Sequence, residues 1–149
     1  MLTLTRCLPA DPNAAVCLTL NLDAAERMRS RHRFQTPDGQ AIYLRLPRGS
    51  VLKAGDLLQS DAGDALVRVA AKPETVMVVT AATPYLLLQA AYHLGNRHVS
   101  LEITETSLRL EPDPVLKVML EQLGLQVSEA ILSFHPEAGA YGHHHNQGG

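Results

Sequence analysis

The first half of the chain alternates short apolar runs with turn-forming residues. A polar, arginine-rich stretch at 23–35 interrupts this pattern once. Short strands with frequent turns are typical of small β-sandwiches and barrels. We therefore predict an N-terminal domain of this class over residues 1–73. Its expected strands cover residues 2–8, 16–22, 41–46 and 65–71.

The pattern changes near residue 73. A β-branched run at 74–81 predicts a strand, and Thr83 followed by Pro84 is typical of a helix start. We expect this helix to end at Gly95, because glycine suits a left-handed C-terminal stop. The helix is apolar nearly all round, whereas packing on a sheet requires only one apolar stripe. The excess predicts a second buried contact, against the β domain or in a homodimer.

The remaining elements complete a recognisable order. A strand, a second strand, a helix and a last strand are expected at 99–103, 107–111, 113–124 and 127–134. Asp113 and Pro114 repeat the helix-start device, and Gly124 is the expected stop. The resulting β-α-β-β-α-β order predicts a ferredoxin-like domain over residues 74–136. Residues 137–149 lack apolar periodicity and are expected to form a flexible tail. The overall fold class is therefore α+β.

Composition narrows the function. The net charge is −2, and the 149 residues include no Trp and two Phe, which disfavours nucleic-acid binding and base stacking. No apolar run approaches the roughly 20 residues that a membrane span needs, and the N-terminal apolar stretch is too short for a signal peptide. We expect a soluble cytoplasmic protein. In a reducing compartment, Cys7 and Cys17 are expected to be small buried thiols on strands, with a disulfide or a metal role as the alternatives.

Two histidines lie near the expected end of the first helix. His93 and His98 are five residues apart, which places them poorly for joint chelation on one helix. We expect His98 at the start of a strand on an exposed edge, where the simplest interpretation is a surface histidine. In a two-fold dimer, however, one residue near the axis appears twice, and two imidazoles would meet.

The tail carries His143, His144 and His145 in succession. Neutral imidazole is a good ligand for nickel, copper and zinc, and a mobile end can close over a metal ion held elsewhere. Such a site would exchange its ion, unlike a closed structural zinc site. A remnant of an expression tag is the alternative interpretation of this run.

Two further histidines have plainer interpretations. His32 lies among Arg27, Arg29, Arg31 and Arg33, which indicates either a solvated strand edge or a contact surface for an acidic partner. His135 is expected to be a local surface residue that could assist the tail.

Several segments together resemble the UreE family of urease accessory metallochaperones. They are GNRHV at 95–99, DPVLKVMLEQLGL at 113–125, FHPEAGAYGHHH at 134–145 and the stretch 29–58. The resemblance implies a two-domain cytosolic homodimer with an N-terminal protein-interaction domain and a metal-binding ferredoxin-like domain. It implies Ni(II) delivery to apo-urease through a complex with other urease accessory proteins, chiefly a GTPase.

The resemblance also assigns ligands. His98 would be the central ligand at the dimer interface, His143, His144 and His145 would join it, and His93 would not be a primary ligand. Zn(II) and Cu(II) are further candidate ions, since imidazole sites do not select nickel by affinity. Some relatives carry a His-x-His pair where this chain has Pro112 and Pro114, so that auxiliary site is expected to be absent.

Two rival functions follow from the residues alone. A metallohydrolase would need three fixed ligands and a nearby carboxylate base, for which Glu102 and Glu105 are the neighbours of His98 in sequence. No His-Glu-x-x-His motif supports it, and we expect a protein that is not an enzyme. A metal-free adaptor is the second rival.

Overall fold

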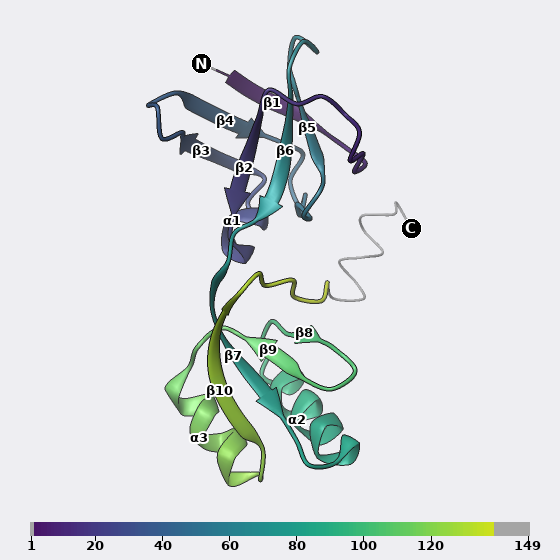
Figure 1. The fold of residues 1–149 in the computed structure, drawn as a ribbon, viewed down its shortest axis with the longest axis vertical. Helices are drawn as coiled ribbons and strands as arrows, with labels where there is room; N and C mark the ends of the chain where they lie inside the picture. The colour runs from purple at the N-terminus through teal and green to yellow at the C-terminus, as the bar shows by residue number, and fades with distance from the viewer. Residues whose placement is uncertain (1, 139–149) are drawn as a thin grey trace. The chain divides into compact units, whose positions relative to one another are not determined.

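The computed structural model describes residues 2–138, which form two compact units. One unit ends at Lys72 and the other begins at Pro73 (Figure 1). The first part is β-rich and the second part is mixed, and each has its own apolar core. No helix in the described part of the chain is long and apolar enough to cross a membrane.

The first unit is built on a single six-stranded sheet. Its strand order is β2-β6-β5-β1-β4-β3. The pairs β1–β4 and β2–β6 are parallel, and the other neighbours are antiparallel. The sheet curls so that β3 and β4 run across the direction of β2 and β6 (Figure 1). The elements are β1 Leu2–Leu8, β2 Leu18–Leu22, α1 Ala24–Arg27, β3 Arg31–Gln35, β4 Ala41–Arg45, β5 Leu57–Ser60 and β6 Leu66–Ala71.

Alternating burial on these strands creates the first core. On β4, Ile42 and Leu44 are fully buried while Arg45 is exposed, as a strand with one apolar face requires. Each fully buried Leu or Ile contributes about 1.5–3 kcal/mol. The core comprises Leu4, Leu20, Leu22, Ile42, Leu44, Leu46, Leu52, Leu58, Val67 and Val69.

Three elements of the first unit were not predicted from the sequence pattern. The stretch 23–35 holds α1 and β3, and β5 lies between two turns. Asp23 and Glu26 form a reciprocal capping box at the start of α1, with N–H donors 2.8 and 3.0 Å from the carboxylates. On β3, only His32 and Phe34 turn inward, with ring centroids 4.4 Å apart. Charged or polar residues at the other positions hid the strand.

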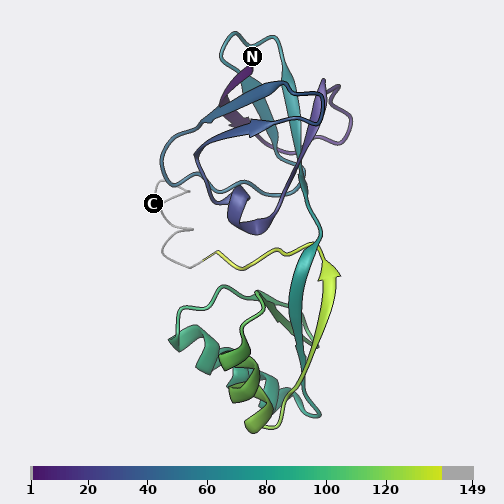
Figure 2. The ribbon, with the colours of Figure 1, turned by 90° about the vertical axis from the view of Figure 1, so that its left-hand side faces the viewer.

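The second unit has a four-stranded antiparallel sheet with strand order β10-β7-β9-β8. Both of its helices lie on one side of this sheet (Figure 2). Apolar residues of both helices share a core with β7 and β9, including Leu94, Leu120, Met77 and Leu108. The elements are β7 Glu74–Thr80, α2 Pro84–Asn96, β8 Glu102–Ile103, β9 Leu108–Leu110, α3 Pro114–Gln122 and β10 Gln126–Leu132.

Both predicted helix starts are confirmed. Thr83 Oγ1 accepts from the N–H of Leu86 at 3.3 Å. The Asp113 carboxylate accepts from the first turn of α3, at 2.9 and 3.1 Å. A proline at the first helical position follows each cap, where its missing N–H costs no hydrogen bond.

Candidate metal centre

His98 follows the last turn of α2 and has a left-handed backbone. Its φ is +56°, the one positive value among the described residues other than glycine. Two hydrogen bonds fix it: the N–H of His98 donates to Gly95 O at 3.0 Å, and the N–H of Val99 donates to Leu94 O at 3.1 Å. This pair is a complete Schellman motif, with His98 at the position that normally takes glycine.

The end of α3 repeats this geometry with glycine. Gly124 has φ +97°, its N–H donates to Glu121 O at 3.0 Å, and the N–H of Leu125 donates to Leu120 O at 3.0 Å. A non-glycine residue in this conformation costs about 1–2 kcal/mol. The same fold therefore uses glycine at one helix end and retains histidine at the other, where glycine would relieve the strain.

The expected stop at Gly95 was wrong. Gly95 lies within α2, which ends at Asn96, and its φ is not positive. The stretch 99–103 is also mostly irregular, because β8 covers only Glu102–Ile103. His98 is exposed, as predicted, but it lies in a helix-terminating turn and not at a strand start.

His93 is half-buried on α2, with its ring 5.5 Å from that of Tyr92. Within residues 2–138, no three His, Cys, Asp or Glu side chains are grouped closely enough to hold a metal ion. A metal bound by His98 would therefore need ligands beyond those residues of one chain. His143, His144 and His145 lie outside the described residues.

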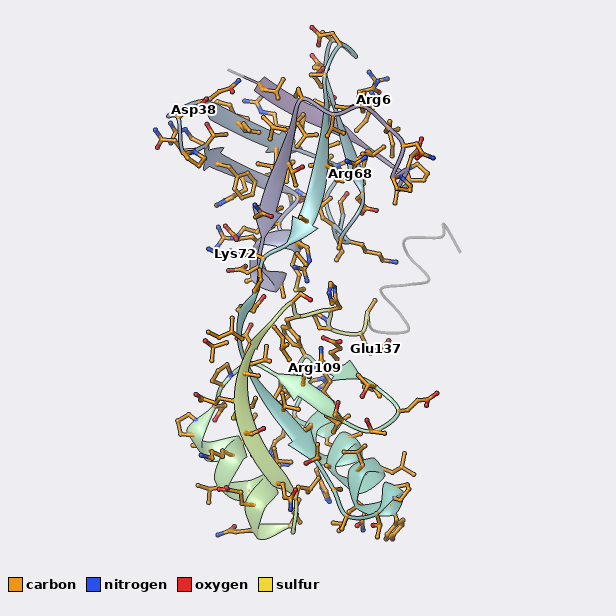
Figure 3. The ribbon with its side chains drawn as sticks, in the orientation of Figure 1. Arg6, Asp38, Arg68, Lys72, Arg109 and Glu137 are labelled. Atoms are coloured by element: carbon orange, nitrogen blue, oxygen red, sulfur yellow. The ribbon has the colours of Figure 1, made fainter. Side chains whose placement is uncertain are left out.

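His135 belongs to a short hydrogen-bonded segment after β10. Its N–H donates to Glu102 Oε1 at 2.9 Å, and its ring Nε2 lies 3.1 Å from Ser133 Oγ. The N–H of Glu137 donates to Leu101 O at 2.6 Å, which holds this segment against the start of β8 (Figure 3). The segment 135–137 is thereby anchored to Leu101 and Glu102, which follow His98 by three and four residues.

Glu102 is already engaged by these contacts. Its Oε2 also forms an ion pair with Arg109 Nη1 at 3.3 Å, with both side chains largely buried. A carboxylate that holds a cation and a backbone N–H is poorly placed to act as a general base. The carboxylate nearest to His98 in sequence thus has a structural role.

A stripe of large apolar side chains remains exposed on α2. Tyr85, Leu88 and Tyr92 are 68%, 69% and 66% exposed. Their spacing of three and four residues places them on one side of the helix. The second contact that the sequence predicted for this helix is not made within this unit. Contiguous exposed apolar surface of this kind marks interaction sites.

The cysteines and one arginine differ from expectation. Cys7 and Cys17 are both exposed free thiols, and not buried. Cys7 lies on β1, whereas Cys17 lies just before β2 and not on a strand. Because β5 and β6 separate β1 from β2 in the sheet, the two cysteines are too far apart for a disulfide at about 4.8 Å per strand. Arg27 is only 4% exposed and donates to Leu22 O at 2.9 Å, so it does not belong to a surface patch.

Cys7 also has an unreactive environment. Its Sγ lies 3.7 Å from Asp56 Oδ2. Although the Cys7 side chain reaches the surface, the protein atoms around it partly desolvate the thiol. This desolvation, followed by the negative charge and hydrogen bond of Asp56, raises the pKa of Cys7 to about 11. A thiol with such a raised pKa stays protonated at neutral pH and is a poor metal ligand.

These features define a two-domain protein that presents an imidazole at its surface, held there at the expense of backbone strain. Comparison with known proteins specifies the family. Residues 4–72 match the N-terminal domain and residues 74–149 the C-terminal domain of the UreE urease accessory protein. The chain belongs to the UreE family of urease accessory proteins, and it is an accessory protein, not an enzyme.

Individual relatives agree with this assignment over almost the whole chain. The urease accessory protein UreE of Nostoc sp. is 59% identical over 145 residues, covering 97% of this chain and 99% of the relative. That of Nostoc punctiforme is 58% identical over 146 residues, covering 98% and 99%. That of Microcystis aeruginosa is 49% identical over 152 residues, covering 98% and 96%.

Proposed function

We propose that this protein is a nickel metallochaperone that delivers Ni(II) to apo-urease during assembly of the urease metallocentre. His98 from each subunit of a homodimer holds the ion at the interface, and His143, His144 and His145 complete or regulate the site. The accessory GTPase and other urease accessory proteins are its partners in the cytoplasm. Zn(II) and Cu(II) are competing ions, since copper outranks nickel at imidazole sites.

The observation that carries this proposal is the left-handed backbone of His98. Strained residues persist where the side chain is needed, and the inference runs from the strain to a function. Glycine would fit at position 98 without strain, because Gly124 occupies the equivalent turn at the end of α3. We therefore attribute the retained strain to a functional need for the imidazole of His98.

Two further observations support a shared site. The described residues of one chain provide no cluster of three potential ligands, so His98 requires a second copy or the tail. The exposed stripe of Tyr85, Leu88 and Tyr92 on α2 offers the apolar surface that a symmetric dimer needs.

The domain roles follow from the same proposal. We assign the second unit to the ferredoxin-like class, because its β-α-β-β-α-β order has the sheet order β10-β7-β9-β8. It would be the metal-binding domain, over residues 74–136, with residues 137–149 as the ligand-bearing tail. The curled sheet of residues 1–73 resembles a small open barrel and would be the protein-interaction domain.

Nickel titration calorimetry on the untagged chain tests the proposal. We expect about one ion per dimer, as a two-fold shared site requires. His98→Ala is expected to abolish this binding, and truncation after Gly142 is expected to weaken it. His93→Ala is the matched control, because it removes a neighbouring imidazole and is expected to bind like the parent.

The opposite results have a clear meaning. If His98→Ala binds nickel like the parent chain, the interface site is wrong, and an adaptor with an incidental histidine tail becomes the better description. Because a ligating imidazole must be neutral, nickel affinity is also expected to fall below about pH 6.5. Affinity that stays flat from about pH 8 to about pH 5 would contradict histidine ligation.

A further inference from the structure

Positive charge is concentrated on one hairpin of the first unit. Residues 29–48 contain five arginines and one acidic residue, Asp38, a net charge of five minus one, or +4, in a chain whose total is −2. All five arginines are exposed. They are Arg29, Arg31, Arg33, Arg45 and Arg48, and we call this set the arginine hairpin.

The register of β3 and β4 brings like charges together. Arg31 is directly opposite Arg45, and Arg33 is opposite Tyr43. The N–H of Leu46 donates to Ser30 O at 2.9 Å, which makes that pair hydrogen-bonded. The next pair, Arg31–Arg45, is therefore of the non-hydrogen-bonded kind, in which side chains approach most closely. Like charges in this position are destabilising.

The hairpin does not neutralise this charge itself. Within residues 2–138, none of the five arginines forms an ion pair with a carboxylate. Strands β1, β3, β4 and β5 contain no Asp or Glu. Asp38 lies at the turn of the hairpin, beyond the ends of the strands (Figure 3), and is hydrogen-bonded to Thr36. The arginine hairpin thus lacks an acidic counterpart in the described chain.

The outer edge of β3 adds backbone donors and acceptors to this surface. β3 is the last strand of its sheet, and within the described chain no strand pairs with its other side. Because the pairs at Ser30 and at Thr36 are the hydrogen-bonded ones, the N–H and C=O groups of Arg31, Arg33 and Gln35 point away from β4. Such an edge is a template for an added strand.

We infer that the edge of β3 is a docking site for an extended acidic segment of a partner protein. The segment adds a strand beside β3, and Asp or Glu side chains at alternate positions face Arg31, Arg33 and Arg45. Alternation is required because side chains on one face of a strand recur every second residue. The inference rests on the proposed protein-interaction role of the first unit and specifies the partner's chemistry.

The backbone edge is what favours a polypeptide over a nucleic acid. A polyanion would be attracted by the arginines alone, in a salt-dependent way. A strand would need the outward N–H groups of β3 as well. The two kinds of partner therefore respond differently to a substitution that removes one of these N–H groups and leaves every charge in place.

The test uses the full chain without nickel and a fluorescent peptide in which Glu alternates with Val. Fluorescence anisotropy measures its affinity, and a peptide with Lys in place of Glu is the first control. Arg31→Thr and Arg45→Thr are each expected to weaken binding about fivefold to tenfold. Lys117→Gln, which removes an exposed cation from α3, is expected to leave it unchanged.

Gln35 tests the backbone part of the site. Gln35→Pro removes an outward N–H without changing a charge, and proline is tolerated on an edge strand. It is expected to weaken peptide binding about tenfold, because it removes a hydrogen bond to the added strand and disturbs the local register of that strand. Gln35→Thr keeps the N–H and is expected to bind like the parent.

Two results would overturn the inference. One is a Glu peptide that binds no more tightly than the Lys peptide. The other is that Gln35→Pro and Gln35→Thr bind the Glu peptide equally well and that the parent chain binds a single-stranded oligonucleotide as tightly as the Glu peptide. Unspecific charge attraction would then explain the binding. The experiment is independent of nickel, so a negative result would not affect the test of nickel binding by His98. A chain that binds the peptide but not nickel would overturn only the metallochaperone proposal.

Discussion

Arg31 on β3 and Arg45 on β4 lie directly opposite each other, and both side chains are exposed. A fold gains nothing from this pairing, because opposed like charges in a sheet cost about 0.2–1 kcal/mol. The surrounding strands carry no carboxylate that could offset the repulsion. The pair is therefore better explained by what binds to the surface than by the stability of the domain.

The first prediction concerns this repulsion. Arg31→Thr is expected to stabilise the first unit by about 0.5 kcal/mol at low salt, because it removes one of two opposed charges and supplies a β-branched residue. Amide hydrogen exchange of the buried β4 residues Ile42 and Leu44 measures the change in that unit alone.

Arg31→Lys is the matched control, since it keeps the charge and is expected to change little. The stabilisation by Arg31→Thr is expected to shrink in about 1 M salt, where the screening length falls to about 3 Å. A destabilised Arg31→Thr variant would show that the arginine makes a favourable contact in the free protein.

The second prediction separates strain from metal binding at His98. His98→Gly is expected to be more stable than His98→Ala by about 1 kcal/mol, because only glycine adopts the left-handed conformation without cost. Both variants are expected to lose the proposed nickel site equally. Thermal unfolding of the second unit and nickel calorimetry provide the two measurements.

Gly124→Ala serves as the reciprocal control. An added Cβ there would meet Leu86 Cδ2 at 3.9 Å, an ordinary contact, so its expected loss of about 1 kcal/mol reports the backbone alone. Equal stability of His98→Gly and His98→Ala would remove the argument that strain marks this histidine.

The third prediction concerns the exposed stripe on α2. Leu88→Lys is expected to convert the proposed homodimer to a monomer, because it would bury a charge in an apolar interface. The helix itself is expected to persist, since Leu88 is 69% exposed and lysine is a good helix former. Sedimentation analysis measures the mass, and circular dichroism the helix content.

Ile131→Lys makes the same change at a residue on β10 that is 72% exposed. It is expected to leave the dimer intact. A monomeric parent chain would contradict the proposed homodimer. A Leu88→Lys variant that stays dimeric would place the subunit contact elsewhere. Either result would weaken the proposal of a shared His98 site.

The fourth prediction follows from the raised pKa of Cys7. At about pH 8.5, the ordinary value for a thiol, Cys7 remains protonated because its own pKa lies near 11. Asp56→Asn is expected to lower the pKa of Cys7 and to speed its alkylation several-fold, since the thiolate is the reactive form. Asparagine retains an oxygen that can accept from the N–H of Lys53 as Asp56 does at 2.9 Å.

A Cys17→Ser background restricts the measurement to one thiol, and the rate with iodoacetamide against pH gives the pKa directly. The rate of the parent is expected to keep rising up to about pH 11, whereas that of Asp56→Asn reaches its plateau earlier. Identical pH profiles would show that burial alone sets the pKa of Cys7.

Local sequence determined the helix starts and one helix end. Thr83 and Asp113, each followed by proline, form caps from side chains only two or three residues from the N–H groups that they satisfy. Gly124 ends α3 as predicted, because its own backbone freedom suffices. The family resemblance was also available from the order of short segments, and the comparisons confirm it.

Tertiary structure decided what local pattern did not specify. β3 is a strand because β4 pairs with it, although its outward positions are charged or polar. The parallel pairs β1–β4 and β2–β6 join segments that no turn connects. His98 takes a left-handed conformation because core packing of Leu94 and Val99 closes the turn around it. Sequence offers the local preferences, and long-range packing overrides them wherever burial is worth more than the strain of one residue.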